Sequence, residues 1–379
     1  MYTPSKRIEY LDSIRGLAAL FVLLSHATAA FVWPECYTKV WTVPFISICF
    51  DGPGAVAMFL LLSGFVLSRP YIPEDSRSQP VRKVFLPTFY LRRFIRIWAP
   101  WFFVFILSLL SRKLFFTQPT TVPPISRWLS QFWHAPMTVS DFLRQCIFQL
   151  HDPTKLLLIQ DWSLGVELKG SILVPLFIYL SVRKRLPFLW LIAGFFLLFI
   201  ATGHYYIIFI IGVLIARFEK RLMVLFTDRA RGVRLVIFLA GLTLYQGLKF
   251  FPQLMGGNQW GTKLGWLISG VGCALVLICA LGSSAIQRVL LHRTIVLLGR
   301  ISYSLYLLQF IIILCLLPDI VYALNQLGIH ANAILFPTTV LASVIATVLC
   351  SIAMYQFVEV PVIAFGHAAT KRIQARFDK

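Results

Sequence analysis

The sequence has few charged residues, and acidic residues are scarcer than basic ones. Asp, Glu, Lys and Arg make up 13% of its 379 residues, whereas a soluble protein carries about 25%. Hydrophobic residues make up 58%, and the mean hydropathy is +0.79. This composition excludes an ordinary soluble globular domain and predicts an integral membrane protein.

Clustered metal-ligating residues are also missing. The seven cysteines are scattered, without a Cys-x-x-Cys or Cys/His cluster, so we predict no metal site. Cys36 and Cys49 share one predicted loop and would pair only in an oxidising compartment, which their spacing does not decide. The first apolar run lacks a cleavage pattern, so we expect it to be retained as a membrane span.

Positive charge exceeds negative charge by a wide margin. The chain has 35 Lys and Arg against 15 Asp and Glu, for a net charge of +20. In a membrane protein this surplus gathers in cytoplasmic loops, so we expect no nucleic-acid partner. A basic inner surface instead favours anionic lipids or an anionic cofactor as partners.

Long apolar runs recur along the whole chain. Crossing the hydrocarbon core takes roughly 20 helical residues, and on this basis we predict about ten membrane-spanning helices. They cover residues 11–31, 53–70, 94–111, 162–182, 187–203, 205–217, 233–249, 264–283, 298–317 and 334–357. The fifth and sixth are alternatively one helical hairpin broken around Thr202, Gly203 and His204. The predicted fold class is therefore an all-α polytopic membrane protein.

Basic residues alternate between the connections of these spans. They concentrate at both chain ends and in every second connection, which places both termini in the cytoplasm by the positive-inside rule. We predict a single transmembrane domain over residues 1–379. It includes an outer loop at about 112–160 with short interfacial helices and a short basic cytoplasmic tail at about 362–379.

Arg15 and His26 lie eleven residues apart in the first predicted span. Eleven helical steps make about three turns, so both residues share one face, about 16 Å apart along the axis. Ionisable residues are expensive inside a bilayer and mark functional sites. Because Arg15 is too distant to touch His26, Glu167 is the predicted partner, since it reaches a similar depth from the fourth span. The pair predicts a general base; the alternative is that each group bonds elsewhere for packing.

The predicted cytoplasmic side carries further cations. Arg15 either pairs with Glu359 at matching depth or faces an anionic ligand, and both readings stay open. Arg92 and Arg96 share a helix face and suit phosphate, although basic residues flank most cytoplasmic helix ends. The ninth span opens with a polar stripe that we interpret first as helix packing. The stripe consists of Ser302, Tyr303, Ser304, Tyr306 and Gln309.

Taken together, six motifs in chain order resemble the membrane-bound acyltransferase-3 family. They are Tyr10–Ala19 followed by His26, then Phe59–Phe65, Arg92–Ile97, Asp161–Glu167, Gly299–Leu307 and Val358–Pro361. The first includes the Arg-x10-His spacing of the family. The matches extend over nearly the whole chain, and it is their combination that is specific.

The resemblance implies transfer of an acyl group, usually acetyl, from acyl-CoA to a hydroxyl of a carbohydrate or glycan. His26 is then the general base, with an acyl-His26 intermediate as the alternative mechanism. Glu167 orients His26 or binds the acceptor, and Arg15 lines the CoA path or holds the site in shape. The implied CoA-binding residues are Arg92, Arg93 and Arg96, and the implied substrate-binding residues are Ser63, Trp162, Tyr303 and Tyr306.

Two departures from the family pattern bear on the acceptor. Gln309 stands where the family commonly has His, and Gly170 and Ser171 follow Glu167 where aromatic residues are usual. A rival hypothesis is a transporter that moves a small solute through the same polar stripe. A third is a protein that keeps the fold and only binds glycan. We expect location in the plasma (inner) membrane.

Overall fold

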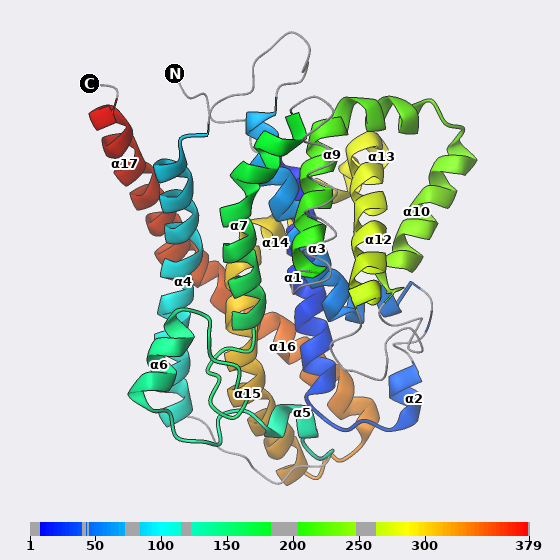
Figure 1. The fold of residues 1–379 in the computed structure, drawn as a ribbon. Coiled ribbons are helices and arrows are strands. Elements are labelled where there is room, and N and C mark those ends of the chain that lie inside the picture. Colours follow the sequence, from blue (N-terminus) through cyan, green and yellow to red (C-terminus); the bar gives the residue numbers. More distant parts are fainter. Residues whose placement is uncertain are drawn as a thin grey trace. The chain divides into compact units, whose positions relative to one another are not determined.

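The computed structural model describes residues 8–39, 43, 45–72, 84–114, 123–182, 204–247 and 263–377, and helices dominate these ranges (Figure 1). In the described part of the chain, seven helical stretches are long and apolar enough to cross a membrane. The predicted all-α membrane fold is therefore confirmed. Extended structure in these ranges is limited to one isolated bridge between Phe31 and Ile125.

The seven candidate spans coincide with seven of the predicted ones. They lie in α1 (Glu9–Ala29), α3 (Gly52–Ser68) with η3 (Arg69–Tyr71), α4 (Leu86–Leu114), α7 (Asp161–Val182), α12 (Lys263–Gly282), α15 (Ser302–Gln326) and α16 (Asn332–Met354). The last continues through a π-helical turn, η5 (Tyr355–Glu359), into α17 (Val360–Phe377). The predicted basic tail is thus helical as far as Phe377.

Other helices occupy the remaining described segments. They are α2 (Glu35–Thr38), η2 (Ser47–Phe50), α5 (Arg127–Ser130), α6 (Val139–Cys146), α9 (His204–Thr227), α10 (Arg231–Tyr245), α13 (Ser284–Leu290) and α14 (Arg293–Arg300). Helices α5 and α6 lie in the predicted outer loop and confirm that it contains short helices. The predicted spans 205–217 and 233–249 fall on α9 and α10, which are not among the seven.

The span predicted at 187–203 lies outside the described residues, as do Thr202 and Gly203 of the predicted break. His204 is the first residue of α9. The count of about ten spans and the cytoplasmic location of both termini therefore stay predictions. All seven cysteines, Cys36 and Cys49 included, are free thiols.

The chain divides into two compact units, each made of three separate segments. The first unit comprises Met1–Ala18, Pro53–Tyr90 and Val166–Gly299, and the second comprises Ala19–Gly52, Leu91–Gly165 and Arg300–Lys379. In the first unit α12 packs against both α9 and α10, and in the second α15 packs against α16 (Figure 1). Because each unit combines segments distant in the sequence, local patterns alone do not define it.

Helices in the first unit approach one another at glycines. A Cβ atom at Gly64 of α3 would lie 2.2 Å from the carbonyl oxygen of Phe209 in α9, and one at Gly212 would lie 2.2 Å from that of Leu61. A Cβ atom at Gly16 of α1 would lie 2.4 Å from the nitrogen of Gly299 in α14. Small residues permit such contact and gain dispersion energy where lipid supplies no hydrophobic driving force. Gly16, Gly64 and Gly299, which belong to three of the family-like motifs, thus have a packing role.

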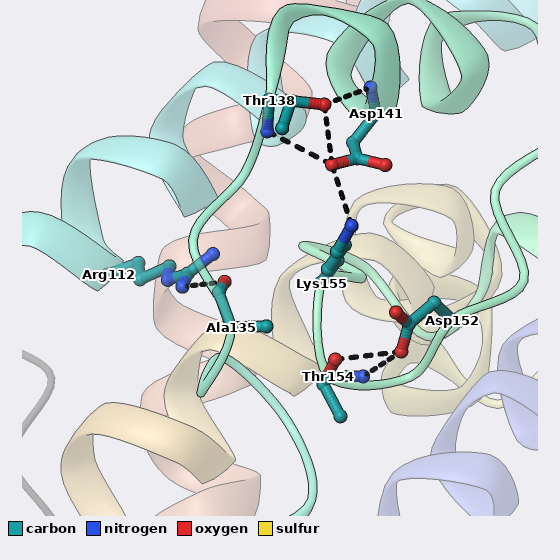
Figure 2. Close-up of polar contacts among 7 residues, drawn as sticks. All are labelled: Arg112, Ala135, Thr138, Asp141, Asp152, Thr154 and Lys155. Carbon is teal, nitrogen blue, oxygen red and sulfur yellow. Dashed lines mark hydrogen bonds and ion pairs between the residues drawn. The ribbon is translucent and has the colours of Figure 1, made fainter.

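A hydrogen-bonded cluster lies in the predicted outer loop, within the second unit, as Figure 2 shows. Thr138 caps α6: its Oγ1 accepts from the Asp141 nitrogen at 3.1 Å, and Asp141 Oδ2 accepts from the Thr138 nitrogen at 3.0 Å. Lys155 Nζ lies 3.0 Å from the same Oδ2. The hydrogen bonds from Thr138, followed by Lys155, lower the pKa of Asp141 to about 2. The charged carboxylate therefore joins α6 to the segment that precedes α7.

We expect Gly16→Leu to destabilise the protein by about 1–3 kcal/mol, because its side chain would overlap the main chain of α14. Thermal melting of the detergent-solubilised protein measures the effect. The control is Gly232→Leu in α10, where a Cβ atom meets nothing within 4 Å. Equal melting temperatures for the two variants would contradict the close approach at Gly16.

We expect Asp141→Asn to lower the melting temperature at neutral pH, because the amide cannot replace the carboxylate toward Lys155. The pKa of Asp141 is lowered in the folded protein, so its stabilising contribution is present above its ordinary pKa. That contribution is lost as the pH falls through about 2. The melting-temperature difference between wild type and variant should therefore shrink between pH 5 and pH 2. A constant difference would contradict this prediction.

Candidate active site

His26 lies in the second unit and stacks on an aromatic ring. Its imidazole is half-buried in the last turn of α1, and its centroid lies 5.2 Å from that of Trp128 in α5, with 27° between the ring planes. Trp128 in turn meets Phe132 edge-on, with centroids 5.6 Å apart. Among the described residues, His26 Nδ1 is a buried atom with no hydrogen-bond partner. Aromatic contacts therefore restrict the ring plane while one nitrogen remains unpaired.

Main-chain hydrogen bonds explain why Trp128 reaches His26. The Val32 nitrogen donates to the Pro124 carbonyl, and the Ser126 nitrogen donates to the Ala30 carbonyl, each at 2.9 Å. Ser126 also caps α5 by accepting from the Leu129 nitrogen at 3.2 Å. These bonds attach the segment around α5 directly to the end of α1. The tertiary fold thus places a ring from the predicted outer loop on the predicted base.

Tyr306 organises a polar network in the same unit. Its hydroxyl lies 2.6 Å from Ser163 Oγ, at the start of α7. Its main-chain oxygen accepts from Gln160 Nε2 at 2.9 Å and from Gln309 Nε2 at 3.1 Å. The side chains of these four residues are buried. Tyr306 is therefore both a predicted substrate residue and a point that joins α15 to the segment before α7.

Gln309 lies beside His26. Its side chain is fully buried and interacts with the imidazole. Its Oε1 has no hydrogen-bond partner within the described ranges, like the Nδ1 atom of His26. Gln160 Oε1 is unpaired in the same sense. These three are among the unpaired buried atoms of the second unit, and unsatisfied buried groups of this kind require an explanation.

Asp161 directly precedes Trp162, a predicted substrate-binding residue, and its carboxylate has a structural role. Its carboxylate accepts from Trp101 Nε1 at 2.7 Å and from Gln145 Nε2. Both partners are buried, and Asp161 is 2% exposed. This part of the Asp161–Glu167 motif fixes the start of α7 against α4 and α6. Trp162 itself is half-buried.

Glu167 belongs to the first unit, where Ser63 Oγ donates to its Oε1 at 2.8 Å. Two predicted site residues, one from α3 and one from α7, are thereby brought together. His26 belongs to the second unit, so the pairing of Glu167 with His26 stays a prediction. Beside Glu167, a Cβ atom at Gly170 would lie 2.7 Å from the Phe209 ring. An aromatic residue from α9 thus occupies space next to the departure at Gly170.

The predicted CoA-binding arginines all lie in the second unit, on α4, in different environments. Arg92 Nε donates to Thr370 Oγ1 of α17 at 2.8 Å, which joins the first part of α4 to the C-terminal helix. Arg93 is 8% exposed, whereas the side chain of Arg96 is exposed. Tyr303, a predicted substrate residue, instead donates its hydroxyl to the Ile97 carbonyl at 2.6 Å.

Arg15 and Glu359 belong to different units. Arg15 Nε is buried without a hydrogen-bond partner among the described residues. Glu359 accepts from the Ser304 nitrogen at 2.8 Å and from the Ser304 hydroxyl. Part of the polar stripe on α15 therefore serves helix packing, as predicted for Ser304. The Arg15–Glu359 pair stays a prediction.

Sequence reasoning did not assign Trp128, Gln160 or Ser163 to the site. Trp128 lies 102 positions after His26 in the numbering, and no periodic pattern connects the two. Ser163 and Gln160 had a weak signal, since they lie in or next to the Asp161–Glu167 motif. The sequence shows Gln309 only as a departure from the family pattern, and its position beside His26 is known from the structure. Within the described residues, no group of three or more His, Cys, Asp or Glu is arranged to hold a metal ion.

Comparison with known proteins agrees with the motifs. The O-acetyltransferase OatA of Staphylococcus aureus strain NCTC 8325 / PS 47 is 23% identical over 398 aligned positions, which cover 97% of this chain. The proteins of the same name from strains COL and MRSA252 match equally. The chain spans 59% of the length of these curated relatives. No solved structure matches it.

The match to a protein family extends over a much longer part of the chain than any single motif. Residues 8–356 match the acyltransferase-3 family, which is described as an acyltransferase domain. The matched range contains Arg15, His26, the arginines of α4 and Glu167. Because the match covers nearly the whole chain, the protein belongs to the acyltransferase-3 family.

Proposed function

We propose that the protein is an integral membrane O-acetyltransferase that uses acetyl-CoA and a hydroxyl of a carbohydrate or glycan. The observation that carries the proposal is the family match over residues 8–356, which provides the acyl-transfer chemistry. The name of the curated relatives, O-acetyltransferase, supports acetyl as the transferred group. We further propose that the protein acts in the plasma membrane.

In the proposed reaction His26 is the general base. It takes the proton from the acceptor hydroxyl while that oxygen attacks the thioester carbonyl. The carbon–sulfur bond then breaks, the acetyl ester forms, and the imidazolium returns the proton to the CoA thiolate. Support comes from the stacking of His26 on Trp128, which restricts the ring, and from its half-buried position. Transfer through an acetyl-His26 intermediate is the competing mechanism.

The donor is proposed to bind along the basic start of α4. Arginine suits phosphate because its planar fork donates paired hydrogen bonds. Arg96 supports this role because its side chain is exposed, whereas Arg93 is buried and Arg92 donates to Thr370. We assign Arg15 to the CoA path or to holding the site in shape.

The acceptor is proposed to be hydroxyl-rich. Ser63 and Glu167 form a hydrogen-bonded pair whose oxygens suit sugar hydroxyls, and Trp162, Tyr303 and Tyr306 are proposed to line the acceptor path. Tyr303 and Tyr306 also have the structural hydrogen bonds described above. These hydrogen-bonding groups therefore support a hydroxyl-bearing acceptor of the carbohydrate or glycan class.

We expect His26→Phe to reduce acetyl transfer by about 100-fold or more, because the ring can still stack on Trp128 but has no nitrogen to accept a proton. Membranes that contain the protein are supplied with acetyl-labelled CoA and glycan acceptors. CoA release and labelled product are both measured. The control is His292→Phe, which replaces an exposed imidazole that contacts Thr294.

The outcomes separate the rival functions. Transfer at the wild-type rate in His26→Phe would contradict the assigned base. Label retained on wild-type protein without acceptor, and absent from the variant, would favour the acetyl-His26 mechanism. Solute flux without CoA release would favour a transporter, and glycan binding without CoA release would favour a binding protein.

We expect Arg96→Gln to raise the KM for acetyl-CoA about threefold to tenfold, equivalent to about 0.7–1.4 kcal/mol of binding free energy. The kcat should change little, since the phosphates are remote from the reacting carbonyl. Arg288→Gln, which replaces an exposed arginine in the last turn of α13, is the control. An Arg96→Gln enzyme with an unchanged KM at low salt would remove Arg96 from the proposed donor site.

A further inference from the structure

We propose that Gln309 is the positioning residue of His26. Its Oε1 accepts a hydrogen bond from the Nδ1–H of His26, which leaves Nε2 unprotonated and available to the acceptor hydroxyl. The catalytic consequence of this inference rests on the proposed function. The predicted tautomer itself does not depend on any activity.

The Gln309 amide has a defined orientation. Its Nε2 donates to the Tyr306 carbonyl at 3.1 Å, and Gln160 Nε2 donates to the same carbonyl at 2.9 Å. A flipped Gln309 amide would place its oxygen against that carbonyl oxygen and lose the bond. The network therefore turns Oε1 away from Tyr306. An amide oxygen accepts hydrogen bonds and donates none.

Two unpaired atoms belong to His26 and Gln309, whose side chains interact. His26 Nδ1 and Gln309 Oε1 are each buried without a hydrogen-bond partner in the described part of the chain, and the two side chains interact. An unsatisfied buried donor or acceptor costs about 1–3 kcal/mol. A hydrogen bond between the two atoms would satisfy both at once. Only a proton on Nδ1 allows this bond, because Oε1 supplies none.

Gln309 is a neutral partner for the imidazole. A hydrogen bond at one imidazole nitrogen decides which tautomer is present and so which nitrogen is the base. A carboxylate partner would also stabilise the imidazolium, whereas an amide oxygen orients the ring without adding a charge. Gln309 is fully buried, so an uncharged group is the less costly one at this position.

The tautomer is tested directly by NMR of the protein in nanodiscs with ¹⁵N-labelled histidine. The chain has seven histidines, and the signal of His26 is identified by its loss in His26→Phe. We expect the Nδ1–H form in the wild type and loss of this preference in Gln309→Met, which keeps the size of the side chain but has no amide oxygen. An Nε2–H form in the wild type would overturn the proposal, whatever the activity.

Kinetics test the positioning role. We expect Gln309→Met to lower kcat about 10-fold to 100-fold while the KM for acetyl-CoA stays within twofold. Gln309→Glu keeps an acceptor oxygen, so it should retain more turnover than Gln309→Met. Its carboxylate would stabilise the imidazolium, so the acid limb of the pH–rate profile should move to higher pH. Gln287→Met is the control, because its amide also donates to main-chain carbonyls, those of Ala280 and Leu281.

The two proposals fail in different ways. Wild-type activity in Gln309→Met, or a Gln309→Glu profile that coincides with that of the wild type, would overturn the positioning role. If Gln309→Met does not fold, the profile of Gln309→Glu and the tautomer of the wild type still decide. If wild-type membranes transfer no acetyl group, the proposed function fails, and the NMR result alone then decides the inference about Gln309.

Discussion

A buried polar group without a hydrogen-bond partner costs several kcal/mol in hydrocarbon, and the structure depends on this constraint. Asp161 accepts from Trp101 and Gln145, and Glu359 accepts from Ser304. Each of these bonds joins parts of the chain that are distant in sequence. Burial of polar groups in this protein therefore contributes to specifying which helices meet.

Against these paired buried groups stand several buried side-chain atoms that have no hydrogen-bond partner among the described residues. Within the described residues, His26 Nδ1, Gln309 Oε1 and Gln160 Oε1 are three of the nine buried side-chain atoms without a hydrogen-bond partner, and all three lie in the second unit. Proteins violate local rules mainly at functional or strained sites. Because His26 and Gln309 interact, their two unpaired atoms support the view that the end of α1 and the first part of α15 are arranged for chemistry as well as for stability.

Close packing through small residues is the second organising feature. Gly16, Gly64 and Gly212 each lie where a side chain would overlap the main chain of another helix. In a membrane, packing and hydrogen bonds replace the hydrophobic driving force between helices. Motifs such as Arg15–Gly16 consequently combine a residue of proposed function with a residue of close contact.

Much of the fold followed from composition and apolar length. Seven predicted spans coincide with helices that are long and apolar enough to cross a membrane, because span length depends on bilayer thickness and not on neighbouring helices. The helices at 205–217 and 233–249 were predicted as spans but are not among the seven, and α17 extends the helix through the predicted tail. Apolar length alone does not specify helix ends or the role of a partly polar helix.

The candidate site was only partly predictable. The sequence by itself determined the membrane class, the helical spans and the residues expensive enough in a bilayer to be proposed as functional, such as His26, because these follow from local composition and helical periodicity. Only the tertiary structure decided that Trp128 stacks on His26, that Ser63 pairs with Glu167 and that Gln309 lies beside the imidazole. These contacts join helices and loops that no sequence period relates. They depend on main-chain hydrogen bonds and close packing that form only when the whole chain has folded.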